Sequence, residues 1–432
     1  MILSKKLSRK SFAVYGLGLT GCSVAECLKK SKVKNYYLWD DNKKKRNLLK
    51  IKINIKEFLK SLQKVDYIVI SPGINLKKNK FQKILLKNKF KIITDLDLFY
   101  MMEKVPKSIV ITGTNGKSTT CKIVEHLLKK NNIDAKICGN IGKPILSISQ
   151  GKKTFFIIEA SSFQLSYAKF IKPNYAAILN ISNDHLDWHG SVKNYINSKF
   201  KIFSLQDKNC FALLQNKILI NKFKKNSYLG KLLIVRLKSY QKIKNNIKNI
   251  YLSSKVNEEN MSFAYCLSKK LKINDKNFVK SFSTFRGLPH RHELFYKKNQ
   301  IKFINDSKAT SFQSSKFAIE NNDNIFWIVG GLPKPGDKFY LDGLKNKIIK
   351  SYIIGKNINF FKNQLKNKIQ YEVSNNIKNS LISIFKKINK SSNKSTVVLL
   401  SPASASYDQY KNFVERGNEF KKLAKLYAKQ YL

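Results

Sequence analysis

The chain has 432 residues, which is long enough for about three domains, each with its own core. Its 83 Lys and Arg residues exceed its 27 Asp and Glu residues, giving a formal charge of +56 that could indicate binding to nucleic acid or an anionic membrane. The lysines are spread through every segment and rarely form arginine-rich or aromatic-interleaved patches, which favours a general lysine bias over a polyanion-binding role.

The six cysteines show neither zinc-ligand spacing nor a paired framework, as expected of reduced thiols in the cytosol. No apolar run approaches the roughly 18 residues needed to span a membrane. Basic residues before the apolar segment 12–19, followed by Cys22, resemble a lipoprotein processing site, but Gly16 and Gly18 interrupt that segment. We therefore expect a cytoplasmic protein without membrane insertion.

The first predicted unit begins with a β-α-β motif. It comprises a strand at 13–15, the turn Gly16-Leu17-Gly18-Leu19-Thr20-Gly21, a helix at 22–30 and a strand at 36–39 that ends in Asp40. A GxGxxG turn followed by an acidic residue is typical of dinucleotide sites. An isolated motif of this kind fits another nucleotide, or close packing of helix on strand, equally well.

A third strand, at 65–70, continues the pattern and runs into Ser71-Pro72-Gly73, a loop suited to phosphate. Residues 1–101 are therefore predicted to form a small Rossmann-like domain.

The most informative stretch is the loop Gly113-Thr114-Asn115-Gly116-Lys117-Ser118-Thr119, which follows an apolar strand at 108–112 and opens into a helix. Backbone N–H groups of such a loop surround phosphate oxygens, Lys117 can reach the β- and γ-phosphates, and Ser118 offers a hydroxyl to Mg²⁺. The usual P-loop has a further glycine where Ile111 stands. The context predicts a nucleoside triphosphate site, and the alternative is a glycine turn with an exposed lysine.

Two more strands of this second unit, at 154–158 and 175–179, are apolar runs typical of buried parallel strands. They place Glu159 and the loop 182–187, which contains His185, at the carboxyl ends of the strands beside the phosphate loop. Acidic and imidazole groups in this position are candidate metal ligands, although each alone could be a surface residue.

A helix is predicted at 192–203, with Lys199 on the face opposite Lys193 and Asn197. The Lys- and Asn-rich segments 215–250 and 356–395 are predicted to be helices or solvated loops.

The third unit is predicted from apolar strands that alternate with helical stretches, which indicates another doubly wound sheet. These strands lie at 302–304, 325–329, 352–354 and 397–400. The predicted fold class is therefore α/β, with domains at 1–101, 102–288 and 289–432.

The ordered set of motifs resembles the Mur ligases, ATP-dependent enzymes that add amino acids to the peptidoglycan precursor, and the resemblance runs through all three units. The motifs lie at 16–21, 71–73, 113–119, 139–142, 159–165, 184–187, 287–291, 305–310, 401–406, 408–413 and 416–420. Within this family the chain is most similar to the members that add D-glutamate.

The resemblance implies an N-terminal UDP-binding domain, a central ATPase-type domain and a C-terminal amino-acid-binding domain. It implies ATP-dependent addition of D-glutamate to UDP-N-acetylmuramoyl-L-alanine through an acyl phosphate, with ADP and phosphate as products. The expected cofactors are ATP and Mg²⁺ at two sites. We expect a cytoplasmic monomer that acts on small molecules and not on nucleic acid.

The resemblance also implies residue roles. For ATP they fall on Gly113, Thr114, Asn115, Gly116, Lys117, Ser118, Thr119, Asn260, Arg291, Asp306 and Lys308. For the UDP substrate they fall on Leu19, Thr20, Asp40, Ser71, Pro72, Gly73, Asn140 and Ser161. For D-glutamate they fall on Thr310, Lys334, Ser406 and Phe413. The implied catalytic residues are Lys117, Glu159, His185 and Lys199, and the implied metal ligands are Ser118, Glu159, His185 and Lys199 as its carbamate.

Three alternatives are weighed against this interpretation. A folylpolyglutamate synthetase shares the P-loop but lacks the N-terminal unit, and the diamino-acid-adding ligase carries an Asn-Pro-Arg signature that this chain lacks. A basic P-loop protein on nucleic acid would explain the charge but not Glu159, His185 and the C-terminal motifs. Nucleic acid-stimulated ATP hydrolysis would favour that third alternative.

Overall fold

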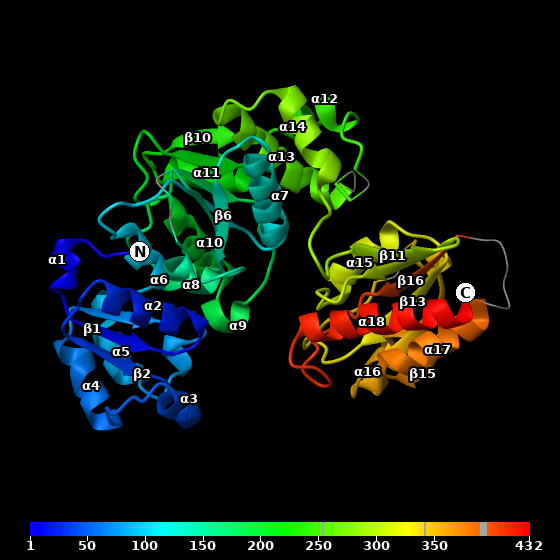
Figure 1. Ribbon diagram of the computed structural model, residues 1–432, viewed down its shortest axis with the longest axis horizontal. Coiled ribbons are helices and arrows are strands. Elements are labelled where there is room, and N and C mark those ends of the chain that lie inside the picture. The colour runs from blue at the N-terminus through cyan, green and yellow to red at the C-terminus, as the bar shows by residue number, and fades with distance from the viewer. Residues whose placement is uncertain (150, 152, 250, 253–254, 341–342, 389–394) are drawn as a thin grey trace. The chain divides into compact units, whose positions relative to one another are not determined.

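The computed structural model describes residues 1–149, 151, 153–249, 251–252, 255–340, 343–388 and 395–432. The chain divides into two compact units, residues 1–285 and 286–432 (Figure 1). The described residues form three sheets, two in the first unit and one in the second, which confirms the predicted α/β class. None of the helices in these described ranges is long and apolar enough to cross a membrane.

The N-terminal sheet is parallel, with the strand order β2-β1-β3-β4. Its strands are β1 (Phe12–Tyr15), β2 (Tyr36–Trp39), β3 (Tyr67–Ile70) and β4 (Ile92–Ile93). The helical segments around it are α1 (Lys5–Ser8), α2 (Leu19–Lys30), α3 (Lys43–Leu48), α4 (Ile55–Lys64), η1 (Leu76–Lys78), α5 (Gln82–Lys87), η2 (Lys89–Lys91) and α6 (Asp95–Tyr100). The predicted β-α-β motif is confirmed.

The central sheet is also parallel, with the strand order β10-β9-β8-β5-β7-β6. Its strands are β5 (Ser108–Thr112), β6 (Ala135–Gly139), β7 (Phe155–Glu159), β8 (Tyr175–Ile178), β9 (Phe211–Leu214) and β10 (Lys231–Ile234). Its helical segments are α7 (Lys117–Lys130), η3 (Ile145–Ser147), α8 (Ser162–Tyr167), α9 (Leu186–His189), α10 (Val192–Phe200), η4 (Lys201–Phe203), α11 (Lys217–Lys225), α12 (Leu237–Lys244), α13 (Lys255–Lys270), α14 (Asp275–Ser281) and η5 (Phe282–Thr284).

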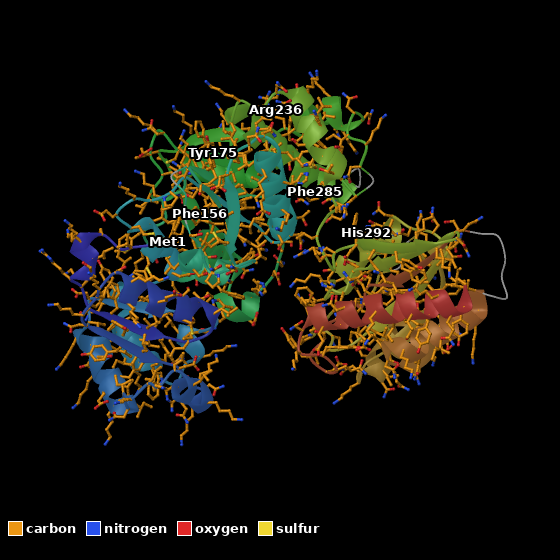
Figure 2. All side chains as sticks on the ribbon, in the orientation of Figure 1. Met1, Phe156, Tyr175, Arg236, Phe285 and His292 are labelled. Carbon is orange, nitrogen blue, oxygen red and sulfur yellow. The ribbon has the colours of Figure 1, made fainter. Side chains whose placement is uncertain are left out.

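Strand β5 lies in the middle of the central sheet and is buried along its whole length. Its residues alternate between two hydrophobic cores, with Ile109 and Ile111 on one face and Val110 on the other. The core around Val110 also contains Phe12 and Val14 of β1, and Phe156 of β7 (labelled in Figure 2). The N-terminal and central sheets therefore share a core, which is why they form one compact unit.

The C-terminal sheet has the strand order β11-β12-β16-β13-β14-β15 and is parallel except for β11 at its edge. Its strands are β11 (Glu293–Lys298), β12 (Ile301–Asn305), β13 (Ile325–Gly330), β14 (Ile348–Ile354), β15 (Tyr371–Asn375) and β16 (Thr396–Leu400). Its helical segments are α15 (Phe312–Glu320), η6 (Lys345–Lys347), α16 (Ile358–Leu365), α17 (Ile377–Ile388) and α18 (Phe413–Tyr431). In Figure 1, α17 and α18 lie side by side.

The prediction that residues 215–250 and 356–395 form only helices or loops is wrong for two strands. The first is β10 and the second is β15, and each is at the edge of its sheet. Edge strands face solvent along one side and tolerate polar residues, as at Glu372 and Ser374 of β15, whereas the apolar run of β10 after Lys231 is short.

Candidate active site

The phosphate loop leaves the carboxyl end of β5 and ends at Gly116, directly before α7 begins at Lys117. Gly116 has φ +81°, and a Cβ there would collide with the side-chain oxygen of Asn260. Glycine is required at this position on both grounds, because other residues rarely adopt that φ and none has room for a side chain. The predicted nucleotide residue Asn260 therefore lies against the phosphate loop.

The loop is tied to the end of the neighbouring strand β8. The amide N–H of Thr114 donates to the Asn180 carbonyl at 2.9 Å, and that of Asn115 donates to Asn180 Oδ1 at 2.8 Å. Lys117 Nζ donates to the carbonyls of Gly113 and Thr114 at 2.9 and 2.8 Å, so its ammonium lies against the loop itself. This places a cation where the phosphates of a nucleotide would bind.

Lys199 is buried beneath the same loop, with 1% of its surface exposed. Its Nζ donates to the Gly113 carbonyl at 2.8 Å and lies 4.5 Å from the ring centre of Tyr195. Burial, with a smaller contribution from nearby Lys117, lowers the pKa of Lys199 to about 6. Its amine is therefore mostly neutral at pH 7. Lys193 is exposed on the opposite face of α10, as predicted.

Glu159 ends β7, and its position in the sheet pairs with Ile111 of β5. Its side chain is 1% exposed, and its Oε1 accepts a hydrogen bond from Asn140 Nδ2 at 2.8 Å. Its Oε2 is buried and has no hydrogen-bond partner among the described residues. A buried carboxylate oxygen without a partner is energetically unfavourable unless a cation or another donor binds it. Glu159 therefore fits the predicted role of metal ligand.

His185 lies at the start of α9 in a left-handed conformation, with φ +54°. Its ring packs 4.6 Å from that of Phe163, and its Nε2 lies 3.4 Å from Asp184 Oδ2. One turn later, His189 is buried with its Nε2 3.0 Å from Ser162 Oγ. Burial, followed by the nearby charges of His185 and Lys199, lowers the pKa of His189 to about 4. His189 therefore lies close enough to both His185 and Lys199 to feel their charges.

No three His, Cys, Asp or Glu side chains in the described part of the chain gather closely enough to hold a metal ion by themselves. Mg²⁺ in phosphoryl-transfer enzymes is usually bound by one or two carboxylates, with phosphate oxygens and waters completing its six ligands. The residues around the loop fit that pattern, because Glu159 supplies one carboxylate and Ser118 a hydroxyl. A carbamate on Lys199 would supply a second carboxylate.

In the N-terminal sheet, Asp40 supports the glycine turn. Its Oδ2 accepts from the Leu17 amide at 2.6 Å and its Oδ1 from the Asn42 amide at 2.9 Å, while Ser71 Oγ donates to the Gly16 carbonyl at 2.7 Å. These bonds order the start of α2, where Leu19 is 81% exposed. An apolar side chain this exposed on an ordered turn is available to pack against a ligand.

The other residues predicted to bind the UDP substrate lie beside the glycine turn or near Glu159. Thr20 follows Leu19 in the first turn of α2, and Pro72 and Gly73 follow Ser71 after β3. Asn140 holds Glu159, as described above, and Ser161 forms the capping box of α8 with Gln164. The side chains of Asn140 and Ser161 therefore already have partners within the protein.

In the C-terminal unit, predicted nucleotide and D-glutamate residues come together. Lys308 Nζ lies 3.9 Å from the ring centre of Phe413, and Ser307 Oγ donates to the Phe413 carbonyl at 2.8 Å. Asp306 is buried and accepts from Ser401 Oγ at 2.7 Å and from the His292 amide at 3.0 Å. Burial raises the pKa of Asp306 to about 7.

The other predicted residues of this unit lie in its loops. Ser406 is buried, and its carbonyl accepts a hydrogen bond from the Tyr410 amide at 2.8 Å. Lys334 is exposed, three residues before Asp337, whose carboxylate accepts a hydrogen bond from the first amide of α15. Thr310 lies just before α15, and Arg291 just before β11. Asn260 belongs to the first unit and Arg291, Asp306 and Lys308 to the second, so their joint role stays a prediction.

Two residues that lie near the phosphate loop, Tyr195 and His189, were not identified from the sequence. Tyr195 supports Lys199 and its hydroxyl lies 3.0 Å from Thr114 Oγ1, and His189 lies beside them. The available signal was spacing, because Tyr195 is four residues before Lys199 and His189 is four residues after His185. Residues four apart on a helix share a face.

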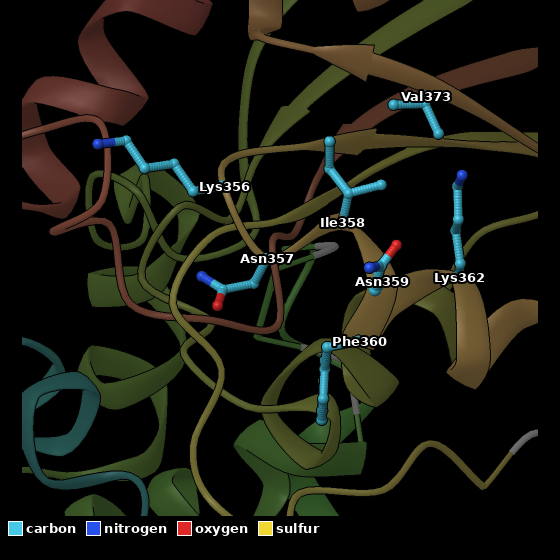
Figure 3. A pocket seen from close by; sticks show the side chains of 7 residues that line it. All are labelled: Lys356, Asn357, Ile358, Asn359, Phe360, Lys362 and Val373. Carbon is cyan, nitrogen blue, oxygen red and sulfur yellow. The ribbon is translucent and has the colours of Figure 1, made fainter.

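A surface cavity of about 580 Å³ in the C-terminal unit has none of the predicted residues in its lining. It is lined by residues 356–360, Lys362 and Val373, at the carboxyl ends of β14 and β15 (Figure 3). Asn357 Nδ2 donates to the Gly331 carbonyl at 3.0 Å, which ties the rim of this cavity to the loop that carries Lys334.

Comparison with known proteins assigns the chain to a family. A model of the Mur ligase MurD-like N-terminal domain matches residues 10–94, and a model of the Mur ligase middle domain matches residues 111–274. The UDP-N-acetylmuramoylalanine--D-glutamate ligase of Rickettsia prowazekii is 34% identical, over 96% of this chain and 98% of the relative. The ligase of the same name from Buchnera aphidicola is 35% identical, over 98% and 99%.

Solved structures share the fold at low sequence identity. The MurF ligase of Thermotoga maritima in complex with ADP has a TM-score of 0.56 and 15% identity, over 98% of this chain and 97% of that structure. The UDP-N-acetylmuramate-alanine ligase MurC of the same organism has a TM-score of 0.55 and 16% identity, over 97% and 100%. With the full-length similarity to curated relatives, these findings show that the chain belongs to the Mur ligase family.

Proposed function

We propose that this protein adds D-glutamate to UDP-N-acetylmuramoyl-L-alanine in an ATP-dependent reaction of peptidoglycan-precursor synthesis. The observation that carries the proposal is the similarity to D-glutamate ligases, at 34 and 35% identity over nearly the whole chain. The packing of Lys117, Lys199 and Asn260 around one phosphate loop supports it. An ATP-dependent reaction on a nucleotide-linked precursor also supports a cytoplasmic location.

The chemistry has two steps. The carboxylate of the muramoyl-alanine attacks the γ-phosphorus of ATP, which forms an acyl phosphate and releases ADP. The amine of D-glutamate then attacks the acyl carbon, loses a proton and expels phosphate, which forms the amide bond. Both steps need charge neutralisation and alignment more than covalent help from the protein.

The residues of the phosphate loop suit the first step. Lys117 neutralises charge on the transferring phosphoryl group, and the loop amides hold the phosphates. Ser118, Glu159, His185 and a carbamylated Lys199 would hold Mg²⁺ at two sites. When bound, Mg²⁺ supplies positive charge that stabilises the phosphoryl transition state.

The other residues suit substrate binding. Asp40 and Ser71 order the glycine turn, and Leu19, Thr20, Pro72 and Gly73 lie beside it to receive the UDP group. Asn140 and Ser161 follow the ends of β6 and β7, near Glu159. In the C-terminal unit, Thr310, Lys334, Ser406 and Phe413 receive D-glutamate. A lysine with hydroxyl and amide donors matches the two carboxylates of that amino acid.

Phosphate release tests the proposal directly. We expect ATP turnover only when UDP-N-acetylmuramoyl-L-alanine and D-glutamate are both present, because the acyl phosphate needs the first and its aminolysis needs the second. L-lysine and diaminopimelate serve as matched amino-acid controls and should give no turnover. Turnover with either one would assign the chain to another amino acid, and stimulation of ATP hydrolysis by nucleic acid alone would contradict the proposal.

Asp40→Ala tests the role of the N-terminal turn. Removal of the carboxylate that holds the Leu17 amide should raise the KM for the UDP substrate, with little change in kcat. The rise should correspond to a loss of binding free energy on the order of 1–2 kcal/mol. Steady-state kinetics with varied UDP substrate measure both parameters.

Asp66→Ala is the matched control, because Asp66 lies just before β3, at the amino end of the same sheet, and pairs with Lys10. Its KM should stay at the wild-type value. An unchanged KM for the UDP substrate in Asp40→Ala would contradict the assignment of Asp40. NAD binding that depends on Asp40 would indicate a dinucleotide site in its place.

A further inference from the structure

Arg416 is the largest charged side chain buried in the C-terminal unit, with 1% of its surface exposed. It lies in the first turn of α18, three residues after Phe413. No ion pair joins it to a carboxylate among the residues that the structure describes. The carboxylate of Asp408 acts on it through space but does not pair with it. Burial of a guanidinium without a paired carboxylate is unfavourable, so an apolar side chain would serve better if Arg416 only filled space.

The guanidinium binds two loops of the C-terminal unit. Nη2 donates to the carbonyls of Ser307 and Ser404, each at 2.9 Å, and Nε donates to Ser307 Oγ at 3.1 Å. Ser307 Oγ in turn donates to the Phe413 carbonyl at 2.8 Å. One side chain therefore joins the loop after β12, the loop after β16 and the start of α18.

A third loop also approaches this guanidinium closely. Nη1 of Arg416 is buried and has no hydrogen-bond partner among the described residues. A Cβ placed on Gly331 would lie 3.1 Å from Nη1 and would collide with Ser404 Oγ and the Ala405 carbonyl. The loop that leads to Lys334 thus passes close to the guanidinium of Arg416 and to Ser404, one of its partners.

The loop after β16 is also strained. Ala403 is fully buried and has φ +56°, a conformation that non-glycine residues adopt only when their surroundings enforce it. The next residue in the chain, Ser404, accepts the hydrogen bond from Arg416 at its carbonyl. This hydrogen bond is well placed to hold that conformation.

The residues beside these contacts are those that the proposed function uses. Ser307 lies between Asp306 and Lys308, Ser404 is two residues before Ser406, and α18 begins with Phe413. We propose that Arg416 is a positioning residue, which holds the nucleotide-binding loop and the D-glutamate-binding loop in register through Ser307 and Ser404. This inference rests on the proposed function of those loops and adds a residue that touches neither ligand.

Arg416→Met keeps the length of the side chain and removes its donors. We expect the KM for D-glutamate to rise about tenfold or more, because charge-assisted hydrogen bonds to two loops are lost. The KM for ATP should rise as well, whereas the KM for UDP-N-acetylmuramoyl-L-alanine should change less than about twofold, because its proposed residues lie in the first unit. Arg416→Lys keeps the charge but not the planar fork of donors, so its KM for D-glutamate should lie between those of the wild type and Arg416→Met.

Phe420→Leu is the matched structural control. Phe420 is fully buried on the same helix, one turn after Arg416, and its ring centre lies 5.5 Å from that of Phe295. It should lower the Tm without changing the KM for D-glutamate. Ser307→Ala, which removes the partner of Nε, is a milder variant that should raise the same KM in a folded protein if Arg416→Met does not fold.

The outcomes separate this inference from the proposed function. Failure of the wild-type protein to turn over ATP with D-glutamate would overturn the proposed function. A wild-type protein that works, with unchanged KM values in Arg416→Lys and Ser307→Ala, would overturn only the role of Arg416. An equal rise in KM in Phe420→Leu would also overturn it, because the effect would then follow from lost stability.

Discussion

Lys199→Ala is expected to lower kcat by about 100-fold or more, because the residue would contribute a metal ligand at the phosphoryl transition state. The structure gives the physical basis. The amine is buried against the Gly113 carbonyl, and a pKa of about 6 leaves it mostly unprotonated at neutral pH. Phosphate release under saturating substrates measures the loss.

The low pKa matters because only an unprotonated amine adds to carbon dioxide. The new N–C bond forms as the amine loses a proton to solvent, and the product carries a carboxylate in place of an ammonium. An unmodified ammonium would repel a metal ion, whereas this carboxylate would bind it. We expect a ¹³C carbamate signal when the wild-type protein is equilibrated with labelled bicarbonate at pH 8, and none in Lys199→Ala.

A short-chain carboxylic acid should restore part of the activity of Lys199→Ala, because it can occupy the vacated space and supply the missing carboxylate. Lys193→Ala, on the exposed face of the same helix, is the matched control and should keep wild-type activity. Full activity in Lys199→Ala or Lys199→Arg would exclude the carbamate. The solvated lysine that the chain's basic composition would suggest is already contradicted by the burial of this residue.

The parts of the fold that the sequence predicts well are the central parallel strands and the residues that follow them. Strand β5 is an apolar, β-branched run between two other buried strands, so its carboxyl end and the phosphate loop could be located from the pattern alone. Strands β10 and β15 could not. Burial is partial at a sheet edge, Glu372 interrupts the apolar pattern of β15, and β10 offers only a short apolar run after Lys231 within a Lys- and Asn-rich segment.

The site is harder to predict, because a motif gives the position of a side chain but not its partner. Asp40 at a strand end suggests a ligand contact, yet its oxygens bind the amides of Leu17 and Asn42. Arg416 lies in a recognisable motif, but its contacts at Ser307 and Ser404 depend on three loops that meet only in the folded unit. The boundaries predicted at 101 and 288 also stay predictions, since the first two sheets share a core.

Glu159→Gln is expected to lower kcat by about 100-fold, with a smaller effect on the KM for ATP, because the loss of a formal charge at the metal acts on the chemical step. The substitution preserves shape. The side-chain oxygen of glutamine can still accept from Asn140 Nδ2, while an amide group replaces the oxygen that has no partner among the described residues. The fold should therefore persist, and the Mg²⁺ concentration required for half-maximal activity should rise.

Glu125→Gln provides a matched control on α7, the helix that follows the phosphate loop. Glu125 lies eight residues after Lys117 on this helix and pairs with Lys122 and Lys129 at 2.8 and 2.9 Å, so its charge should not matter for catalysis. A fall in kcat and a shift in Mg²⁺ dependence confined to Glu159→Gln would support a metal ligand at the end of β7. A normal kcat in Glu159→Gln would contradict it, and the unpartnered oxygen would then require an occupant other than a metal ion.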